Sequence, residues 1–600
     1  MSGRLRAEAR LLWVIAGLVV LFGVVAARDA TLLQAGTYAA IYAVAAIGLS
    51  ILLGNVAQIS VGQAGFFGIG AYTLGFLMTA ATWPAWIPVW LEFLLATLLG
   101  TLLAAALGLL LGFIALRFRG HYLAMATLAF GLIAVGLFRE SKALGGASGL
   151  DNIPFAQFGS LSISGGAAFW YAWGMVAVVV FLTANMLRGR TGRAFEALRN
   201  DELAAEVLGV PTRRAKIVAF TFAGALAGLA GTFYSSYLGV VDPNAVGVSL
   251  SIDLLLMVVV GGAGGVAGAI LGAMLIGISN IYGHNLENWR PVIYGVAVIA
   301  IVIAFPRGLA GIILRGRPRS LPLLPSAPDA ARVAAGPATP APNEGATAPR
   351  LAVDNVSKRF GGLIAVDGVS FALETGRLTS LIGPNGAGKT TLFNLICGVG
   401  RVSSGRVTIA GRDVTGWEPH QIAALGVGRS FQNARLFGDM TVLENVVAGA
   451  YRLERTNLAS DLLALPASRR SGRRALDCAR AVLERLDLTR LANTYARDLA
   501  FGDRRRVELA RALAADPLLM LVDEPAAGLN ASERARLRED LLAIRADGVT
   551  VLLIEHDMRL VMQISDRVMV LEFGRLIADG AAGAVRADAR VVAAYLGTAH

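Results

Sequence analysis

The sequence is poor in charged residues and in cysteine, and both shortages restrict what the protein can be. Charged residues make up 16% of the chain and hydrophobic residues 55%, whereas about 25% of a typical soluble domain is charged. The shortage is uneven, because Leu, Ala, Val, Ile and Gly dominate residues 11–312 and the charges concentrate in residues 350–600. A chain of 600 residues is also too long for a single core. The composition therefore predicts a membrane domain followed by a soluble domain.

The two cysteines, Cys397 and Cys478, both lie in the soluble half, and no motif pairs them. We therefore expect a reducing, cytosolic environment for this half and no structural disulfide. The sequence also lacks a basic run interleaved with aromatic residues, which a base-stacking surface would need. The net charge of +12 suits cytoplasmic loops beside anionic lipid. Membrane lipid is therefore an expected partner, and nucleic acid is not.

Apolar runs recur at the length that a membrane requires, which is roughly 20 residues for a helix. They lie at 11–27, 31–53, 56–80, 91–116, 121–138, 168–187, 217–239 and 290–306. Residues 250–282 are long enough for two shorter, glycine-interrupted passes, so about ten spans are predicted. Arginines near the start of the chain and along residues 188–216 place these segments in the cytoplasm. Glycine clusters at 62–70 and 261–265 are expected to allow close helix contact or broken helices.

Residues 316–349 are rich in proline, alanine and small polar residues. Such a segment cannot form a packed core, so we expect a disordered, semi-extended linker. After the linker, short apolar runs alternate with helical patterns, which is typical of an α/β domain. Strands are predicted at 351–360, 369–374, 378–383, 518–525 and 549–557, the third as the strand that leads into a glycine-rich loop and the last two as buried parallel strands.

A P-loop pattern follows the strand predicted at 378–383 and precedes a predicted helix. Its residues are Gly383, Pro384, Asn385, Gly386, Ala387, Gly388, Lys389 and Thr390, and Thr391 continues the expected binding set. The glycines allow backbone amides to turn toward phosphate oxygens, and Lys389 adds a cation at the β- and γ-phosphates. Thr390 offers its hydroxyl to Mg²⁺. The pattern by itself therefore predicts a nucleotide-binding site that includes a ligand for Mg²⁺.

Two carboxylates, Asp523 and Glu524, end the strand predicted at 518–525. Asp523 is suited to hold Mg²⁺, and Glu524 is placed where a carboxylate polarises the attacking water. The alternative, a helix cap before Pro525, is weaker because a P-loop lies upstream.

With these motifs in place, residues 350–600 resemble the ATP-binding subunits of ABC transporters. The resemblance implies that Phe360 stacks on adenine, that Gln432 is the Q-loop glutamine near metal and water, and that His556 is the switch histidine. It also implies that residues 499–503 form the signature segment, with Gly502 contacting nucleotide. This segment departs from the family pattern, because Ala500 lacks the hydroxyl that normally contacts the γ-phosphate.

More narrowly, three segments resemble the ATP-binding subunit of branched-chain amino acid importers: KRFGGLIAVDGVSF, EPAAGLN and VVAAYLG. Residues 55–73, 144–154, 190–210 and 305–309 resemble a permease subunit of the same systems. The two subunits are usually separate chains, so a fusion is implied. The expected fold is a polytopic α-helical membrane domain of about ten spans fused to an α/β P-loop ABC ATPase domain. Its parts are a permease domain at 1–315, a linker at 316–349 and an ATP-binding domain at 350–600.

The resemblance implies ATP-driven import of branched-chain or related amino acids across the bacterial inner membrane, with the ATPase domain in the cytoplasm. Its implied partners are a second permease and a second ATP-binding subunit, or a second copy of this chain, together with an extracytoplasmic substrate-binding protein. Two alternatives stay open: import of another small polar solute such as urea or short amides, and a non-transporting ABC regulator.

The cytoplasmic loop 190–210 has a helical pattern of its own. Phe195, Leu198, Ala205 and Leu208 fall on one face among charged residues. We expect one short amphipathic helix whose apolar face sits in a groove of the ATPase domain. The alternative is a solvated loop near the membrane.

Overall fold

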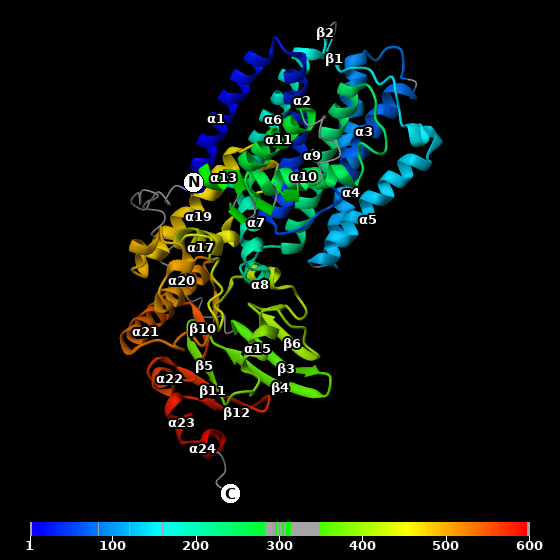
Figure 1. Ribbon diagram of the computed structural model, residues 1–600. Coiled ribbons are helices and arrows are strands. Elements are labelled where there is room, and N and C mark those ends of the chain that lie inside the picture. The colour runs from blue at the N-terminus through cyan, green and yellow to red at the C-terminus, as the bar shows by residue number, and fades with distance from the viewer. Residues whose placement is uncertain are drawn as a thin grey trace. The chain divides into compact units, whose positions relative to one another are not determined.

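The computed structural model describes residues 3–81, 83–118, 120–158, 161–282 and 349–596, with short stretches between 292 and 313. These residues form two compact units (Figure 1). Unit 1 holds those within Met1–Arg199, Arg213–Leu321 and Asp461–Ala464, and unit 2 holds those within Asn200–Thr212, Pro322–Ser460 and Leu465–His600. The predicted linker 316–349, apart from Pro349, and most of the span expected at 290–306 lie outside the described residues.

Unit 1 is helical. Its helices are α1 (Gly3–Ala26), α2 (Ala30–Ser50), α3 (Gln63–Thr79), α4 (Val89–Ala115), α5 (His121–Glu140), α6 (Gly165–Arg188), α7 (Arg190–Asn200), α9 (Thr212–Leu238), α10 (Val248–Gly261), α11 (Val266–Tyr282) and α13 (Gly308–Ile313). A two-stranded hairpin, β1 (Gln157–Phe158) and β2 (Leu161–Ser162), precedes α6. Among the described residues, five helices are long and apolar enough to cross a membrane: Ala30–Asn55, Val89–Ala115, His121–Glu140, Gly165–Arg188 and Thr212–Leu238. Shorter apolar helices add to them at Leu11–Ala26, Val248–Gly261 and Val266–Gly277. The polytopic helical domain is thus confirmed, with fewer strong spans than the ten expected.

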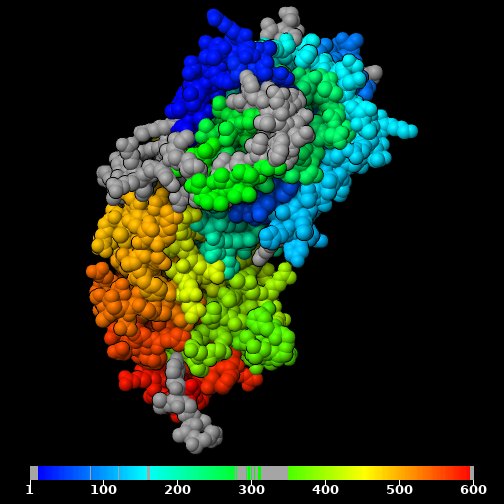
Figure 2. All heavy atoms as spheres, viewed as in Figure 1, coloured from blue at the N-terminus to red at the C-terminus, as the bar shows by residue number. Residues whose placement is uncertain are grey.

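Helix α2 is the buried centre of unit 1, whereas α1 and α4 are apolar on their outer surfaces. The α2 segment is rich in Ala and packs against α6, α10 and α11. Large apolar side chains are exposed on α1 and α4, among them Trp13, Leu21, Leu102 and Leu110; Figure 2 shows α1 in blue at the surface. Exposed apolar surfaces of this extent mark contact with membrane or with partners.

Unit 1 contains two breaks between helices that lie against each other, one after α2 and one between α10 and α11. Helix α2 passes into a π-helical turn, Ile51–Asn55, before the chain becomes irregular ahead of α3. The hydroxyl of Ser50 accepts a hydrogen bond from the Gly264 amide at 3.1 Å and donates one to the Gly265 carbonyl at 3.3 Å. A Cβ atom at Gly54 would overlap the backbone of Gly264. Glycine at these positions therefore allows both the break and the close approach.

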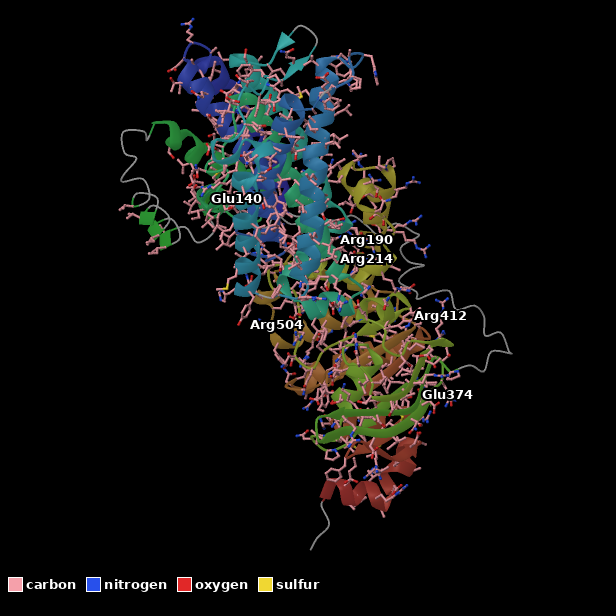
Figure 3. The ribbon with its side chains drawn as sticks, turned by 90° about the vertical axis from the view of Figure 1, so that its right-hand side faces the viewer. Glu140, Arg190, Arg214, Glu374, Arg412 and Arg504 are labelled. Carbon is pink, nitrogen blue, oxygen red and sulfur yellow. The ribbon has the colours of Figure 1, made fainter. Side chains whose placement is uncertain are left out.

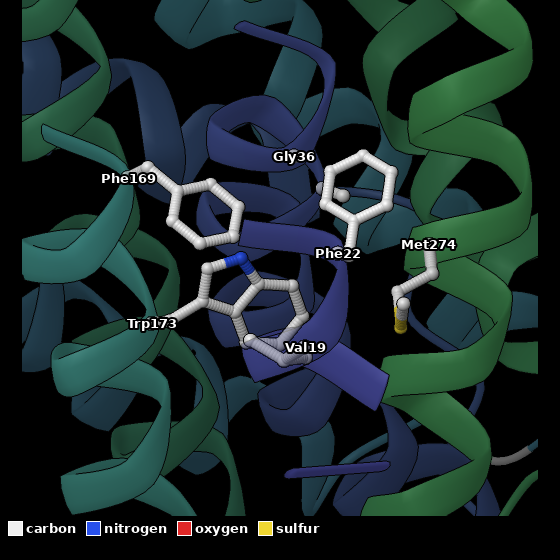
Figure 4. A pocket seen from close by; sticks show the side chains of 7 residues that line it. Val19, Phe22, Gly36, Phe169, Trp173 and Met274 are labelled. Atoms are coloured by element: carbon white, nitrogen blue, oxygen red, sulfur yellow. The ribbon is translucent and has the colours of Figure 1, made fainter. Parts of the chain in front are cut away.

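A small apolar pocket lies inside unit 1 (Figure 4). Its volume is about 10 Å³, and its lining residues are Val19, Phe22, Gly36, Ala39, Phe169, Trp173 and Met274. This volume corresponds to about one water molecule. The pocket is therefore a packing gap and is too small to hold an amino acid.

Helix α7 begins against a carboxylate that is remote in sequence. The Oδ2 atom of Asp461 accepts hydrogen bonds from the Thr191 amide and the Thr191 hydroxyl, both at 2.9 Å. Gly189 precedes α7, and a Cβ atom there would overlap the Asp461 carboxylate. Because a carboxylate is favourable at a helix N-terminus, Asp461 supplies the capping group that glycine lacks. Arg190 of α7 and Arg214 of α9 are labelled in Figure 3.

Unit 2 is an α/β unit with two sheets. The six-stranded sheet has the order β12-β11-β5-β10-β9-β8, with β5 (Leu378–Ile382), β8 (Val427–Arg429), β9 (Leu519–Asp523), β10 (Thr550–Ile554), β11 (Arg567–Glu572) and β12 (Arg575–Gly580). Its strands are parallel except β12. The four-stranded antiparallel sheet has the order β4-β3-β6-β7, with β3 (Leu351–Phe360), β4 (Leu363–Leu373), β6 (Ser404–Ile409) and β7 (Arg412–Asp413). Every residue of β5, β9 and β10 is buried. For β9 and β10 this confirms the buried parallel strands predicted from their apolar runs.

Along the chain, the helices of unit 2 lie before, between and after these strands. They are α8 (Glu202–Val207), α15 (Lys389–Ile396), α16 (Pro419–Ala424), α17 (Val442–Gly449), α19 (Pro466–Arg485), α20 (Phe501–Leu513), α21 (Ala531–Ala546), α22 (Met558–Ile564), α23 (Ala582–Ala587) and α24 (Ala589–Leu596). The short α18 (Leu458–Leu462) is divided, because its last two residues belong to unit 1. Helices α17 and α21 begin with capping boxes, at Thr441 and Asn530, which fixes their first turns.

The expectation of a single helix over 190–210 is wrong. Asp201 is extended and its Oδ1 atom accepts the Ala204 amide at 2.9 Å, so that α7 ends and α8 begins. Phe195 and Leu198 are buried in unit 1, whereas residues 200–212 belong to unit 2, where α8 packs against α16. The apolar face expected as one surface is therefore divided between the two units.

Candidate active site

The glycine-rich loop joins the C-terminal end of β5 to the N-terminus of α15. Gly383 and Gly388 have φ values of 151° and 98°, in the region that favours glycine. A Cβ atom at Gly383 would overlap the Leu571 carbonyl, and one at Gly388 would overlap the Ala365 carbonyl. Only glycine satisfies both the backbone angle and the space, so the loop holds the wrapped shape that presents amides to an anion.

Lys389, the first residue of α15, is turned back over this loop. Its ammonium group donates to the carbonyl oxygens of Gly383 at 2.8 Å and Pro384 at 2.9 Å. Burial lowers the pKa of Lys389, while Glu524 and Asp523 act in the opposite direction. The lysine is thus a buried cation whose hydrogen bonds phosphate oxygens can take over.

The three residues expected in catalysis meet at one carboxylate. Gln432 donates from Nε2 to Oε2 of Glu524 at 2.9 Å, and Nε2 of His556 lies 2.8 Å from Oε1 of the same residue. Glu524 has a φ of 46°, which is uncommon for a residue other than glycine. Its amide donates to the Ile554 carbonyl at 2.9 Å, which ties it to the end of β10. The carboxylate is therefore held between an amide and an imidazole at the C-terminal edge of the sheet.

Asp523 lies beside this group as a buried carboxylate. Burial raises its pKa to about 6, against the opposing effect of Arg429, and Glu524 adds to the rise. Its Oδ1 atom is buried and has no hydrogen-bond partner among the described residues. A free, buried carboxylate oxygen fits a hard cation such as Mg²⁺, which prefers oxygen ligands and phosphates. The described residues contain no group of three or more His, Cys, Asp or Glu that could hold a metal.

The other residues expected to bind nucleotide lie in the loop itself, at the start of α15, or on other elements. Asn385, Gly386 and Thr390 are exposed, Pro384 and Thr391 are half-buried, and Ala387 is buried. Phe360 ends β3 in the four-stranded sheet, is 56% exposed, and has the Lys358 ammonium 4.9 Å from its ring centre. Gly502 lies in the first turn of α20, where a Cβ atom would overlap the Glu533 carboxylate. The structure thus brings Gln432, Glu524 and His556 into contact, while Phe360 and Gly502 have Lys358 and Glu533 as neighbours.

Two residues that sequence reasoning missed hold the site in place. Buried Glu555 accepts the amides of Ala526 at 2.7 Å and His556 at 2.9 Å. The Ser430 hydroxyl accepts the Asp523 amide at 3.2 Å. Glu555 had a usable signal, because a carboxylate at the end of a buried strand needs hydrogen-bond donors. Ser430 had none beyond its place next to Gln432.

Three family models match this chain. The model described as branched-chain amino acid transport system / permease component matches residues 31–305. The ABC transporter model matches residues 366–527, and the branched-chain amino acid ATP-binding cassette transporter model matches residues 575–600. The predicted fusion of permease and ATPase in one chain is thereby confirmed.

Curated relatives match the second half of the chain. The high-affinity branched-chain amino acid transport ATP-binding protein LivG of Salmonella typhimurium is 46% identical over 252 residues, which are 42% of this chain and 99% of that protein. BraF of Pseudomonas aeruginosa, with the same description, is 45% identical over the same shares. A probable LivG of Methanocaldococcus jannaschii is 34% identical over 41% of this chain and 97% of that protein. Among solved structures, a nucleotide-free ATP-binding cassette from an ABC transporter is 33% identical, with a TM-score of 0.37, over 42% of this chain and 100% of that one.

Proposed function

Because this chain belongs to the ABC transporters of the branched-chain amino acid type, we propose that it couples ATP hydrolysis in unit 2 to import of branched-chain amino acids through unit 1. It is a membrane protein with a cytoplasmic ATPase domain, and we place it in the bacterial inner membrane. The observation that carries the proposal is the contact of Glu524 with both Gln432 and His556, in a chain whose other half is a permease.

ATP would bind with its phosphates over residues 383–391. The loop amides and Lys389 would hold the β- and γ-phosphate oxygens, and Phe360 would stack on adenine. Thr390, Asp523 and Gln432 are the residues that would hold Mg²⁺, which neutralises phosphate charge when it is bound. The unpartnered Oδ1 of Asp523 supports this assignment.

Glu524 is the proposed general base. Its carboxylate would take a proton from water as the water oxygen bonds to the γ-phosphorus and the bond to the bridging oxygen breaks, releasing ADP and phosphate. Gln432 and His556 would orient the carboxylate and the water, since both already contact Glu524. Gly502 has no role in this step within its own chain.

Instead, we propose that Gly502 acts on ATP held by a second ATPase domain, so that two such domains must meet. The chain is part of a transporter complex with paired ATPase domains. We assign the partners as a second permease and ATP-binding subunit, with a second copy of this chain as the rival arrangement. An extracytoplasmic binding protein would deliver the substrate.

Uptake by reconstituted vesicles tests the function. Purified complex with its binding protein should accumulate labelled leucine only when ATP is inside with the ATPase domain. Glu524→Gln should abolish this uptake once the site of the second ATPase domain is disabled as well. Accumulation of urea or short amides without leucine would move the function to the other solute class. Binding-protein-independent ATP hydrolysis with no uptake of any solute would favour a regulator.

A further inference from the structure

Helices α4 and α9 pack against each other through small residues. A Cβ atom at Gly108 would come within 2.6 Å of the Phe220 carbonyl oxygen, and one at Gly112 within 2.9 Å of the Ile217 Cα atom. Residue numbers rise along α4 while those of its neighbours fall along α9, so the two helices are antiparallel. Small residues allow such close contact between membrane helices. The end of α4 therefore lies beside the start of α9.

Beyond Gly112 this close contact gives way to a pocket of about 640 Å³. Four apolar side chains at and just past the end of α4 line it together with two arginines: Phe113, Ile114, Leu116, Phe118, Arg117 and Arg213. Phe113 and Phe118 are 54% and 40% exposed. The volume falls within the range of sites that hold small organic ligands, roughly 300–1,000 Å³. Unlike the packing gap beside Phe169, this pocket is large enough for a ligand.

The pocket lies at the cytoplasmic boundary of the membrane. Helices α4 and α9 are two of the five described helices that are long and apolar enough to cross it. Residues 200–212, which lead directly into α9, belong to the unit that contains the cytoplasmic ATPase domain. Arg117 follows the last residue of α4 by two positions, and Arg213 is the second residue of α9. Both arginines therefore lie where the hydrocarbon core of about 30 Å gives way to the lipid headgroups.

The pocket does not neutralise the charge of its two arginines. None of the described residues that line it is acidic. Within the described part of the chain, the Arg117 side chain has no hydrogen-bond or ion-pair partner. Arg213 lies in the first turn of α9, which contains no acidic residue and where the helix dipole disfavours a cation. Helix stability therefore does not explain the position of Arg213, whereas an anion in the pocket would favour both arginines.

The remaining lining residues decide between a soluble anion and an amphiphile. Phosphate suits two guanidinium groups, because their planar N–H forks match its oxygens. Free phosphate would leave the rings of Phe113 and Phe118 in water, whereas an acyl chain would cover apolar surface. Basic pockets between membrane helices on the cytoplasmic side are typical sites for anionic lipid headgroups. A phospholipid meets both requirements.

We propose that the pocket between the end of α4 and the start of α9 binds one anionic phospholipid of the cytoplasmic leaflet. Its phosphate contacts Arg117 and Arg213, and an acyl chain lies against Phe113 and Ile114. The site is independent of the solute that the permease carries, so failure of the proposed function would leave it standing.

Native mass spectrometry of the purified full chain tests the headgroup contact, with phosphatidylglycerol and phosphatidylcholine of equal chain length as probes. The unaltered protein should bind phosphatidylglycerol more tightly. Arg117→Gln and Arg213→Gln should each weaken phosphatidylglycerol binding by about fivefold, as expected for one arginine beside anionic lipid, and should affect phosphatidylcholine less. Arg214→Gln is the matched control, because Arg214 is the next residue of α9 and is exposed but does not line the pocket (Figure 3). It should leave the binding of both lipids unchanged.

The apolar contact needs a second pair of variants. Phe113→Ala should weaken the binding of both lipids by a similar factor, because they share the same acyl chains. Leu110→Ala is its control, since Leu110 is 55% exposed on α4 but does not line the pocket.

Two results would overturn the site. Equal affinity for the two lipids, or equal losses in Arg117→Gln and Arg214→Gln, would make the attraction a diffuse property of the basic segment. Displacement of phosphatidylglycerol by inorganic phosphate, together with unchanged binding in Phe113→Ala, would assign the pocket to a soluble anion instead of a lipid. If Arg117→Gln does not fold, Arg213→Gln provides the same comparison with Arg214→Gln.

Discussion

In unit 2, buried polar positions include a lysine, arginines, aspartates and glutamates, whereas the buried polar residues of unit 1 are mainly serines and threonines. In unit 2 these charges hold loops and strand ends, as Glu555 and Glu508 do. In unit 1 some hydroxyls return to their own helices, as Thr37 does to the Leu33 carbonyl at 2.8 Å. Others bind the backbone of a remote segment, as Ser50 does at Gly264 and Gly265. Charges inside a membrane domain are costly, so unit 1 is shaped by small residues and close backbone contact. Buried charged groups therefore organise the loops and strand ends of unit 2, whereas small residues and close helix contact organise unit 1.

The largest expected effect is on unit 2 alone and leaves unit 1 unaffected. Lys389→Ala removes the buried cation of the glycine-rich loop, and we expect ATP binding to be lost while unit 1 inserts normally. Photolabelling with an ATP analogue measures binding, and protease protection in membranes measures insertion. Labelling at the affinity of the unaltered protein would refute the assignment of this loop to phosphate.

The next effect is on the rate of ATP hydrolysis and not on ATP binding. Glu524→Gln keeps the shape and the contact to Gln432 but removes the base, so ATP binding should persist while hydrolysis slows by roughly 10²- to 10⁴-fold. The measurement is phosphate release at saturating ATP. A second ATPase domain in the complex can mask the loss, so its own site must be disabled, and turnover that then remains normal would remove Glu524 from the role.

How far these sites follow from the sequence differs between local and remote contacts. The loop from Gly383 to Lys389 and the acids at the end of β9 follow from patterns within a few residues. The contact of Glu524 with Gln432 and His556 joins three segments far apart in the chain, and only the family resemblance placed them together. The burial of Arg505, Glu508 and Arg511 on α20 was missed, because a helix with so many charges also fits the pattern of a solvated basic helix. The division of α7 from α8 had a signal, since Asp201 before Glu202 is a helix start.

A smaller effect tests the role of close backbone contact in unit 1. Gly54→Ala places a methyl group against the backbone of Gly264, and overpacking of this kind costs about 1–3 kcal/mol. Thermal unfolding of unit 1 should shift downward while ATP hydrolysis in detergent stays unchanged. Gly17→Ala is the matched control, because a Cβ at that helical position meets no atom within 4 Å. Equal unfolding temperatures in the two variants would show that the contact between Gly54 and Gly264 accommodates a methyl group without loss of stability.

The smallest effect concerns the departure of the signature segment at Ala500. This residue is the N-cap of α20 and makes no side-chain capping bond, although Asp503 favours the helix start through its charge in the first turn. Ala500→Thr should supply a hydroxyl that accepts the Asp503 amide and stabilise unit 2 by about 0.5–2 kcal/mol. Ala500→Val, which has the same shape without the hydroxyl, should give no such gain. Chemical denaturation of unit 2 in the full chain measures the difference. If threonine and valine behave alike, the first turn of α20 is already satisfied, and the missing hydroxyl matters only for nucleotide held by the partner domain. A lower ATP concentration for half-maximal hydrolysis in Ala500→Thr, without any gain in stability, would then identify that contact.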